Sequence, residues 1–125
     1  MTTERTPVST SLRLQNILYT NHMIESVAFY EKLGLYRLED GEVSQWWNEF
    51  PLGDVSLALH WNQDRSLPTE SNPELHLHVS HAEFETIHRD MAEYQPSEIQ
   101  TLERLGRFFT VVDPNGVRVQ LNERS

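Results

Sequence analysis

The chain has 125 residues, a net charge of −9 and no cysteine. This length suits one domain with a hydrophobic core, and the negative charge argues against a nucleic-acid partner, because the phosphate backbone is also negative. Disulfides and thiol chemistry are excluded, and no apolar run reaches the length of a membrane span. The polar N-terminus has no apolar signal-peptide core, so we expect a cytoplasmic protein.

Polar stretches divide the chain into parts. Residues 1–11 are expected to form a flexible tail, and residues 12–125 a single domain. Inside the domain, the polar segment 62–72 is the expected linker between a first module, 12–61, and a second module, 73–123.

The first module predicts a strand, a helix and three further strands. The strand is expected over 12–20 and the helix over 23–34, where Gly34 ends it. The three strands that follow are expected at 35–40, 43–50 and 54–61.

The second module repeats this order. A strand is expected over 74–79 and a helix over 81–94, with Ser80 and Glu83 in the spacing of a capping box. A weak strand near 98–102 precedes a final hairpin. The hairpin turn is Asp113-Pro114-Asn115-Gly116, which suits a type I turn.

The two halves align in register. Residues 14–20 match 73–79, and residues 55–60 match 117–122, with apolar positions opposite apolar positions. The pattern therefore predicts an α+β fold of two βαβββ modules, with the helices on one side of the sheets. We call the opposite sheet surface the cup face, and it is a candidate binding surface.

Strand alternation assigns side chains to the cup face. If Val55, Leu57 and Leu59 pack under a helix, their neighbours point the other way. The predicted cup face then carries Gln15, Ile17, Tyr19, Ser56, Ala58, His60, Glu74, His76, His78, Arg118, Gln120 and Asn122. Trp46 and Trp47 are adjacent, so one ring is expected in the core and the other at the cup or at a dimer seam, where it offers a wall for a flat ligand.

Two motifs carry a family resemblance. The segments Ser26–Tyr30 and Leu33–Leu35 resemble the first helix of the vicinal oxygen chelate superfamily, and Gly106–Phe109 followed by the 113–116 turn resembles its final hairpin. This superfamily includes glyoxalase I, fosfomycin-resistance transferases, extradiol dioxygenases and bleomycin-resistance proteins. The resemblance covers residues 12–123 and implies curved mixed sheets with outer helices.

The resemblance also implies where a metal would bind. Metal-dependent members carry His or Gln, Glu, His and Glu at positions that match Gln15, Ala58, Glu74 and Gln120 here. Because this set has one carboxylate and two amides, we predict no metal cofactor. An alternative is a shifted divalent-metal site that uses His60 and His76.

Two classes of function remain. The first is a small-molecule-binding protein, similar to the homodimeric bleomycin-resistance branch, that binds a flat or cationic compound without a typical metal site. The alternative is a metal-dependent lyase, isomerase or dioxygenase acting on a vicinal-oxygen substrate. No catalytic residue is assigned. The predicted ligand-binding residues are Gln15, Tyr19, Trp46, Trp47, His60, Glu74, His76, Arg118 and Gln120.

Overall fold

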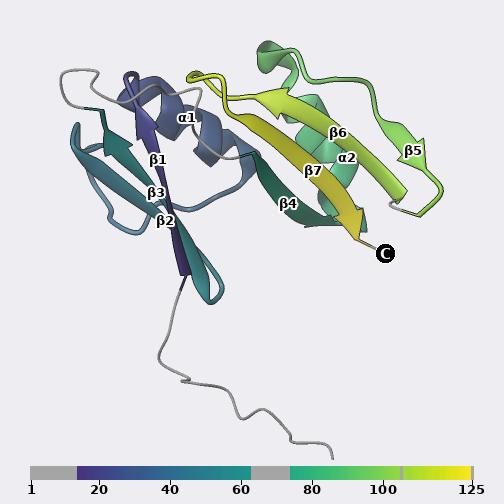
Figure 1. Ribbon diagram of the computed structural model, residues 1–125, viewed down its shortest axis with the longest axis horizontal. Helices are drawn as coiled ribbons and strands as arrows, with labels where there is room; N and C mark the ends of the chain where they lie inside the picture. Colours follow the sequence, from purple (N-terminus) through teal and green to yellow (C-terminus); the bar gives the residue numbers. More distant parts are fainter. Residues whose placement is uncertain (1–13, 63–73, 105, 125) are drawn as a thin grey trace, which may run out of the picture.

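The computed structural model describes residues 14–62, 74–104 and 106–124. These residues form two sheets that lie side by side, and one helix packs on each sheet (Figure 1). The expected tail, 1–11, and all of the expected linker except Asn62 lie outside the described residues.

The first sheet has the strand order β1-β3-β2. Strand β1 (Leu14–Thr20) runs parallel to β3 (Val55–Trp61), and β2 (Trp47–Leu52) pairs antiparallel with β3. Helix α1 (Met23–Leu33) joins β1 to this hairpin and ends at Gly34, whose φ of 112° is the left-handed conformation that the sequence predicts for a helix end. We call this sheet and its helix the first module.

The second sheet has the strand order β4-β7-β6-β5. Strand β4 (Leu75–Ser80) is parallel to β7 (Arg118–Arg124), which pairs antiparallel with β6 (Gly106–Val112). The short strand β5 (Gln100–Leu102) completes the other edge. The 113–116 turn between β6 and β7 is confirmed, because Gly116 N donates to Asp113 O at 3.0 Å.

The core lies between each helix and the sheet beneath it. Along α1, Met23, Val27, Tyr30 and Leu33 are buried at the three- and four-residue spacing of one helical face. The largest fully buried side chains are Tyr30, Phe29, Phe50, Phe84, Phe109, Leu18, Leu59, Met91, Leu121, Val27, Val111 and Val119. Of the side chains assigned to the cup face, Ala58 and Asn122 are buried and the others are exposed or half-buried.

Helix α2 (His81–Asp90) is shorter than predicted. A separate 3-10 turn, Ala92–Tyr94, follows it, and Gln95 then takes a left-handed conformation with φ of 54°. The Ser80 hydroxyl donates to Glu83 at 3.0 Å, so the pair meets without capping a backbone N–H. Neither α1 nor α2 is long and apolar enough to cross a bilayer, and the described residues contain no other helix that is.

The predicted strand at 35–40 is wrong. This segment is not a strand, although Leu38 N donates to Glu49 O at 2.7 Å beside β2. Tyr36 and Leu38 are 85% and 55% exposed, so little apolar burial holds the segment in a sheet. The Arg37 guanidinium instead donates to the carbonyl oxygens of Gly41 and Glu42.

The strand predicted at 43–50 begins only at Trp47. Asn48 closes a local turn with Ser44, since its amide oxygen accepts from Ser44 N at 3.2 Å and its amide nitrogen donates to Ser44 O at 2.7 Å. The Ser44 hydroxyl also accepts from Trp46 N at 3.1 Å. Such side-chain bonds compete with the backbone hydrogen bonds of a sheet, so β2 begins several residues later than predicted.

Candidate functional site

An aromatic row crosses the cup face of the first sheet. His60 on β3 is in register with Tyr19 on β1 and with Trp47 on β2, so the three side chains share one face. The His60 ring meets Tyr19 edge to face at 5.1 Å between centroids, and Trp47 at 5.6 Å. His60 is exposed and its two neighbours are half-buried. The structure therefore brings together three of the predicted ligand-binding residues.

Ala58 lies in the next row of the same face. It is in register with Ile17 on β1 and Glu49 on β2, and it is 0% exposed. One row further, the Gln15 amide donates to the Ser56 hydroxyl at 3.0 Å. The face thus has an apolar centre, with a carboxylate on one side.

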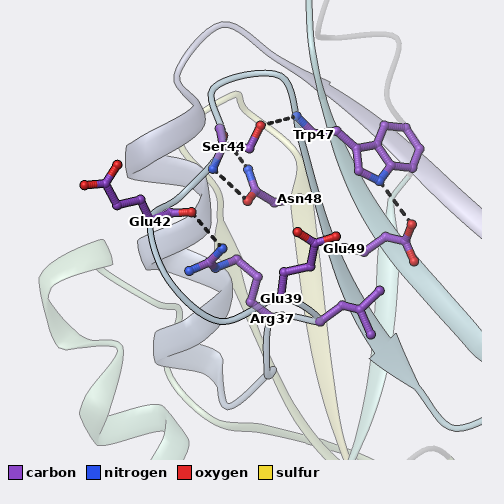
Figure 2. A pocket seen from close by; sticks show the side chains of 8 residues that line it. Arg37, Glu39, Glu42, Ser44, Trp47, Asn48 and Glu49 are labelled. Carbon is purple, nitrogen blue, oxygen red and sulfur yellow. Dashed lines mark hydrogen bonds between the residues drawn. The ribbon is translucent and has the colours of Figure 1, made fainter.

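Glu49 is the site residue that the sequence reasoning missed. Its Oε1 accepts a hydrogen bond from Trp47 Nε1 at 3.0 Å, and Figure 2 shows the carboxylate beside the indole edge. Two hollows, of about 50 and about 360 Å³, share Leu38 and Glu49 in their walls. Alternation along the predicted strand 43–50 places residues 47 and 49 on one face. The pairing of β2 with β3 is what shows that this face is the cup face.

The cup face of the second sheet is polar. His76 on β4 is in register with Gln120 on β7, which is in register with Thr110 on β6. His76 Nε2 lies 3.0 Å from Glu74 Oε1, and the Gln120 amide donates to Asn122 at 2.9 Å. Glu74 therefore pairs with His76, while Arg118 is exposed on the neighbouring strand.

Trp46 lies away from the aromatic row. Its ring packs on Trp61 at 4.7 Å between centroids, and Trp61 is on the other face of β3 from His60. The expectation that one of the adjacent tryptophans is in the core is wrong, because Trp46 is 53% exposed and Trp47 is half-buried. Trp47 is the one that lines the cup face.

A larger groove, of about 610 Å³, runs along the junction of the two modules. Leu35, Leu52 and Val55 form one wall, and Leu77, Val79 and Ile87 line the other. His76 is the predicted ligand-binding residue that reaches it. The other eight lie outside its walls.

The four positions expected to hold a metal do not fit one. Gln15, Glu74 and Gln120 each make a hydrogen bond to a neighbouring side chain, and Ala58 has no donor atom. Among residues 14–62, 74–104 and 106–124, no three His, Asp or Glu side chains gather around a point where an ion would bind. The shifted site is not assembled either, since His60 lies in the aromatic row and His76 on the second sheet.

Solved structures share this architecture. A glyoxalase/dioxygenase from Nostoc punctiforme superposes with a TM-score of 0.71 at 19% identity, covering 100% of this chain and 99% of that chain. A lactoylglutathione lyase from Agrobacterium tumefaciens gives 0.63 at 20%, covering 90% and 93%. A bleomycin-binding protein complexed with bleomycin gives 0.62 at 17%, covering 93% and 100%.

These likenesses define the class of fold. No protein-family model matches the chain, and no curated protein matches it in sequence. The chain has the α+β glyoxalase/bleomycin-resistance fold, as the sequence resemblance implied. At these identities the likeness establishes the fold, and the ligand has to be argued from the site.

Proposed function

We propose that this chain is a cytoplasmic protein that binds a flat or cationic small molecule on the cup face of its first sheet, without a typical metal site. The observation that carries the proposal is the row of Tyr19, His60 and Trp47. Three rings in register offer a surface on which a planar compound stacks. Such ring contacts contribute about 0.5–1.5 kcal/mol each beyond their buried area.

The site also suits binding better than chemistry. Gln15 and Ser56 supply neutral hydrogen-bonding groups beside the row, and Ile17, which is 39% exposed, supplies apolar surface. On the second sheet, Gln120 donates one of its two amide N–H groups to Asn122, and its side chain can still donate the other and accept at its amide oxygen. These groups orient a ligand, and together they lack the anionic ligand set that a divalent ion needs.

The proposal is tested by calorimetric titration with aminoacridine, a flat aromatic cation. Trp47→Ala is expected to weaken binding about tenfold, since the largest stacking surface is lost. Trp46→Ala is the matched control, because it removes an equally large ring from outside the row, and binding should stay within about twofold. Equal effects of the two substitutions, or an effect of Trp46→Ala alone, would remove the support for this site.

We further propose that the chain forms a homodimer in which modules from the two chains complete each cup. Neither described sheet closes on itself, and β1, β2, β4 and β5 are edge strands. Open edges and open concave faces are usually covered in soluble proteins. Light scattering should give twice the chain mass of 14.6 kDa. A monomer at micromolar concentration would contradict this proposal and leave the aromatic row untouched.

A further inference from the structure

Glu49 places a carboxylate at the rim of the aromatic row. We infer that Glu49 is a specificity-determining residue, which makes the cup face of the first sheet select a flat organic cation over a neutral compound of the same shape. This inference rests on the proposed function, because it concerns the same face. Beyond the proposed function, the inference names Glu49 as the residue that makes the site prefer a positively charged ligand.

The register explains why this carboxylate faces the ligand. Glu49 is directly opposite Ala58 in the β2–β3 pair, where side chains start about 4.5–5.5 Å apart. Ala58 ends at its methyl group, so the side chain directly opposite on β3 is too short to reach the Glu49 carboxylate, and Glu49 is half-buried. The resemblance to metal-dependent members implies a carboxylate at the position of Ala58, and in this chain a carboxylate lies opposite that position on β2.

The hydrogen bond to Trp47 gives the carboxylate a second role. Oε1 accepts from the indole N–H at 3.0 Å, which fixes the ring edge against β2. In the part of the chain that the structure describes, Oε2 makes no hydrogen bond and Glu49 has no ion pair. A ring stacked on Trp47 therefore brings a cationic group at its edge within reach of Oε2, and such charge-assisted bonds are the stronger ones.

The side chains around Glu49 carry more negative than positive charge. Arg37 is the cationic side chain in the walls of the two hollows beside Glu49. Its guanidinium donates to the backbone carbonyl oxygens of Gly41 and Glu42, and Figure 2 shows the bond to Glu42. The same walls carry the carboxylates of Glu39, Glu42 and Asp54. Their combined field attracts a cation, in line with the chain charge of −9.

The test compares aminoacridine with acridone, a neutral ring system of nearly the same size, by calorimetry. Wild-type protein should bind aminoacridine more tightly. Glu49→Gln keeps an oxygen for the Trp47 N–H and removes the charge, so aminoacridine binding should weaken about five- to tenfold while acridone binding stays within about twofold. Glu39→Gln is the matched control, because it removes a charge from the same walls without a bond to Trp47, and it should leave the preference in place.

The outcomes separate the two proposals. If Trp47→Ala weakens both compounds and Glu49→Gln changes neither, the selection by Glu49 is wrong and binding on the aromatic row stands. If Glu49→Gln weakens both compounds equally, the residue only positions the indole and the inference fails. If wild-type protein binds neither compound, or Trp47→Ala has no effect, the proposed function fails and the inference fails with it.

Discussion

The Tyr30 hydroxyl donates a 2.8 Å hydrogen bond to Asp113 Oδ2 across 83 residues of sequence. The bond joins α1 of the first module to the hairpin turn of the second. Asp113 Oδ1 accepts from the backbone N–H groups of Asn115 and Val117, at 2.8 Å each. Burial, and then the Asp113 charge, hold the pKa of Tyr30 well above its usual value. Burial also raises the pKa of Asp113, against the hydrogen bonds that favour its charged form.

Tyr30→Phe is expected to lower the free energy of unfolding by about 1–2 kcal/mol, because a buried carboxylate loses a hydrogen bond. Asp113→Ala should lower it by about 3 kcal/mol, since three donors lose their acceptor. Urea denaturation gives both values. Tyr36→Phe is the control, as Tyr36 is exposed, and it should change stability by less than about 0.5 kcal/mol. Equal effects of Tyr30→Phe and Tyr36→Phe would show that the bond between modules contributes nothing.

Asn115 makes the second bond set between the modules. Its Oδ1 accepts from the Thr20 hydroxyl at 2.9 Å and from Asn21 N at 3.2 Å, and its Nδ2 donates to Ser26 at 2.9 Å. Asn115→Ala should reduce the free energy of unfolding by about 2 kcal/mol, because these partly buried groups lose their partners. Gln100→Ala, on an exposed strand residue, is the comparison. A loss no larger than in Gln100→Ala would contradict this account.

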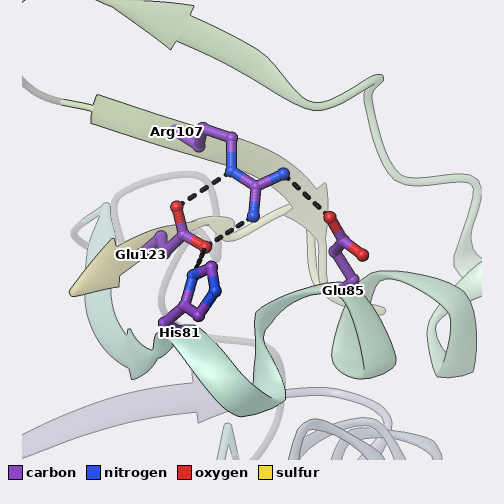
Figure 3. A network of polar contacts seen from close by, with 4 residues as sticks. All are labelled: His81, Glu85, Arg107 and Glu123. Carbon is purple, nitrogen blue, oxygen red and sulfur yellow. Dashed lines mark hydrogen bonds and ion pairs between the residues drawn. The ribbon is translucent and has the colours of Figure 1, made fainter. Parts of the chain in front are cut away.

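Acid stability is expected to depend on Glu123. Its carboxylate lies between Arg107 and His81 (Figure 3). The N–O distances are 2.9 and 2.5 Å to Arg107 and 2.7 Å to His81. Hydrogen bonds from Arg107 lower the pKa of Glu123 from 4.5 to about 2. Because the native state then binds fewer protons than the unfolded state, the stabilisation is complete above pH 4.5 and is lost as pH falls toward about 2.

The stability difference between wild type and Glu123→Gln should therefore shrink as pH falls through this window. Thermal denaturation at several pH values measures it. Glu98→Gln is the matched control, because Glu98 is exposed, and its difference from wild type should stay small at every pH. A Glu123→Gln difference that is independent of pH would show that the ion pair with Arg107 does not shift this carboxyl group.

A metal ion that binds the native state would raise the melting temperature by mass action. We expect no such binding, so added nickel, zinc or iron(II) should change the melting temperature by less than about 1 °C. The reason is that Gln15, Glu74 and Gln120 already have side-chain partners. Gln120→Glu supplies the carboxylate that metal-dependent members carry, and Gln120→Ala removes the amide. A stoichiometric ion in the wild type that is lost in Gln120→Ala would replace the binding proposal with the enzyme alternative.

Local patterns in the sequence determined most of the fold. Period-two alternation marked β3, β4 and β7, and helical spacing marked α1 and α2. Gly34 and the 113–116 turn set boundaries because they need particular backbone conformations. The match between the two halves then implied the duplicated architecture. These signals are local, so they do not depend on which strands become neighbours.

Only the tertiary structure decided the composition of the site. Segment 35–40 has strand-like residues, yet too little of its apolar surface is buried for it to join the sheet. Hydrogen bonds between Ser44 and Asn48 form a local turn, and β2 begins only after it. Trp46 packs on Trp61 and lies outside the aromatic row. The pairing of β2 with β3 placed Glu49 opposite Ala58, which puts the carboxylate beside the aromatic row. Alternation along a strand determines which of its side chains share a face. Which side chains of other strands lie beside them depends on the strand register, and contacts between distant residues set that register.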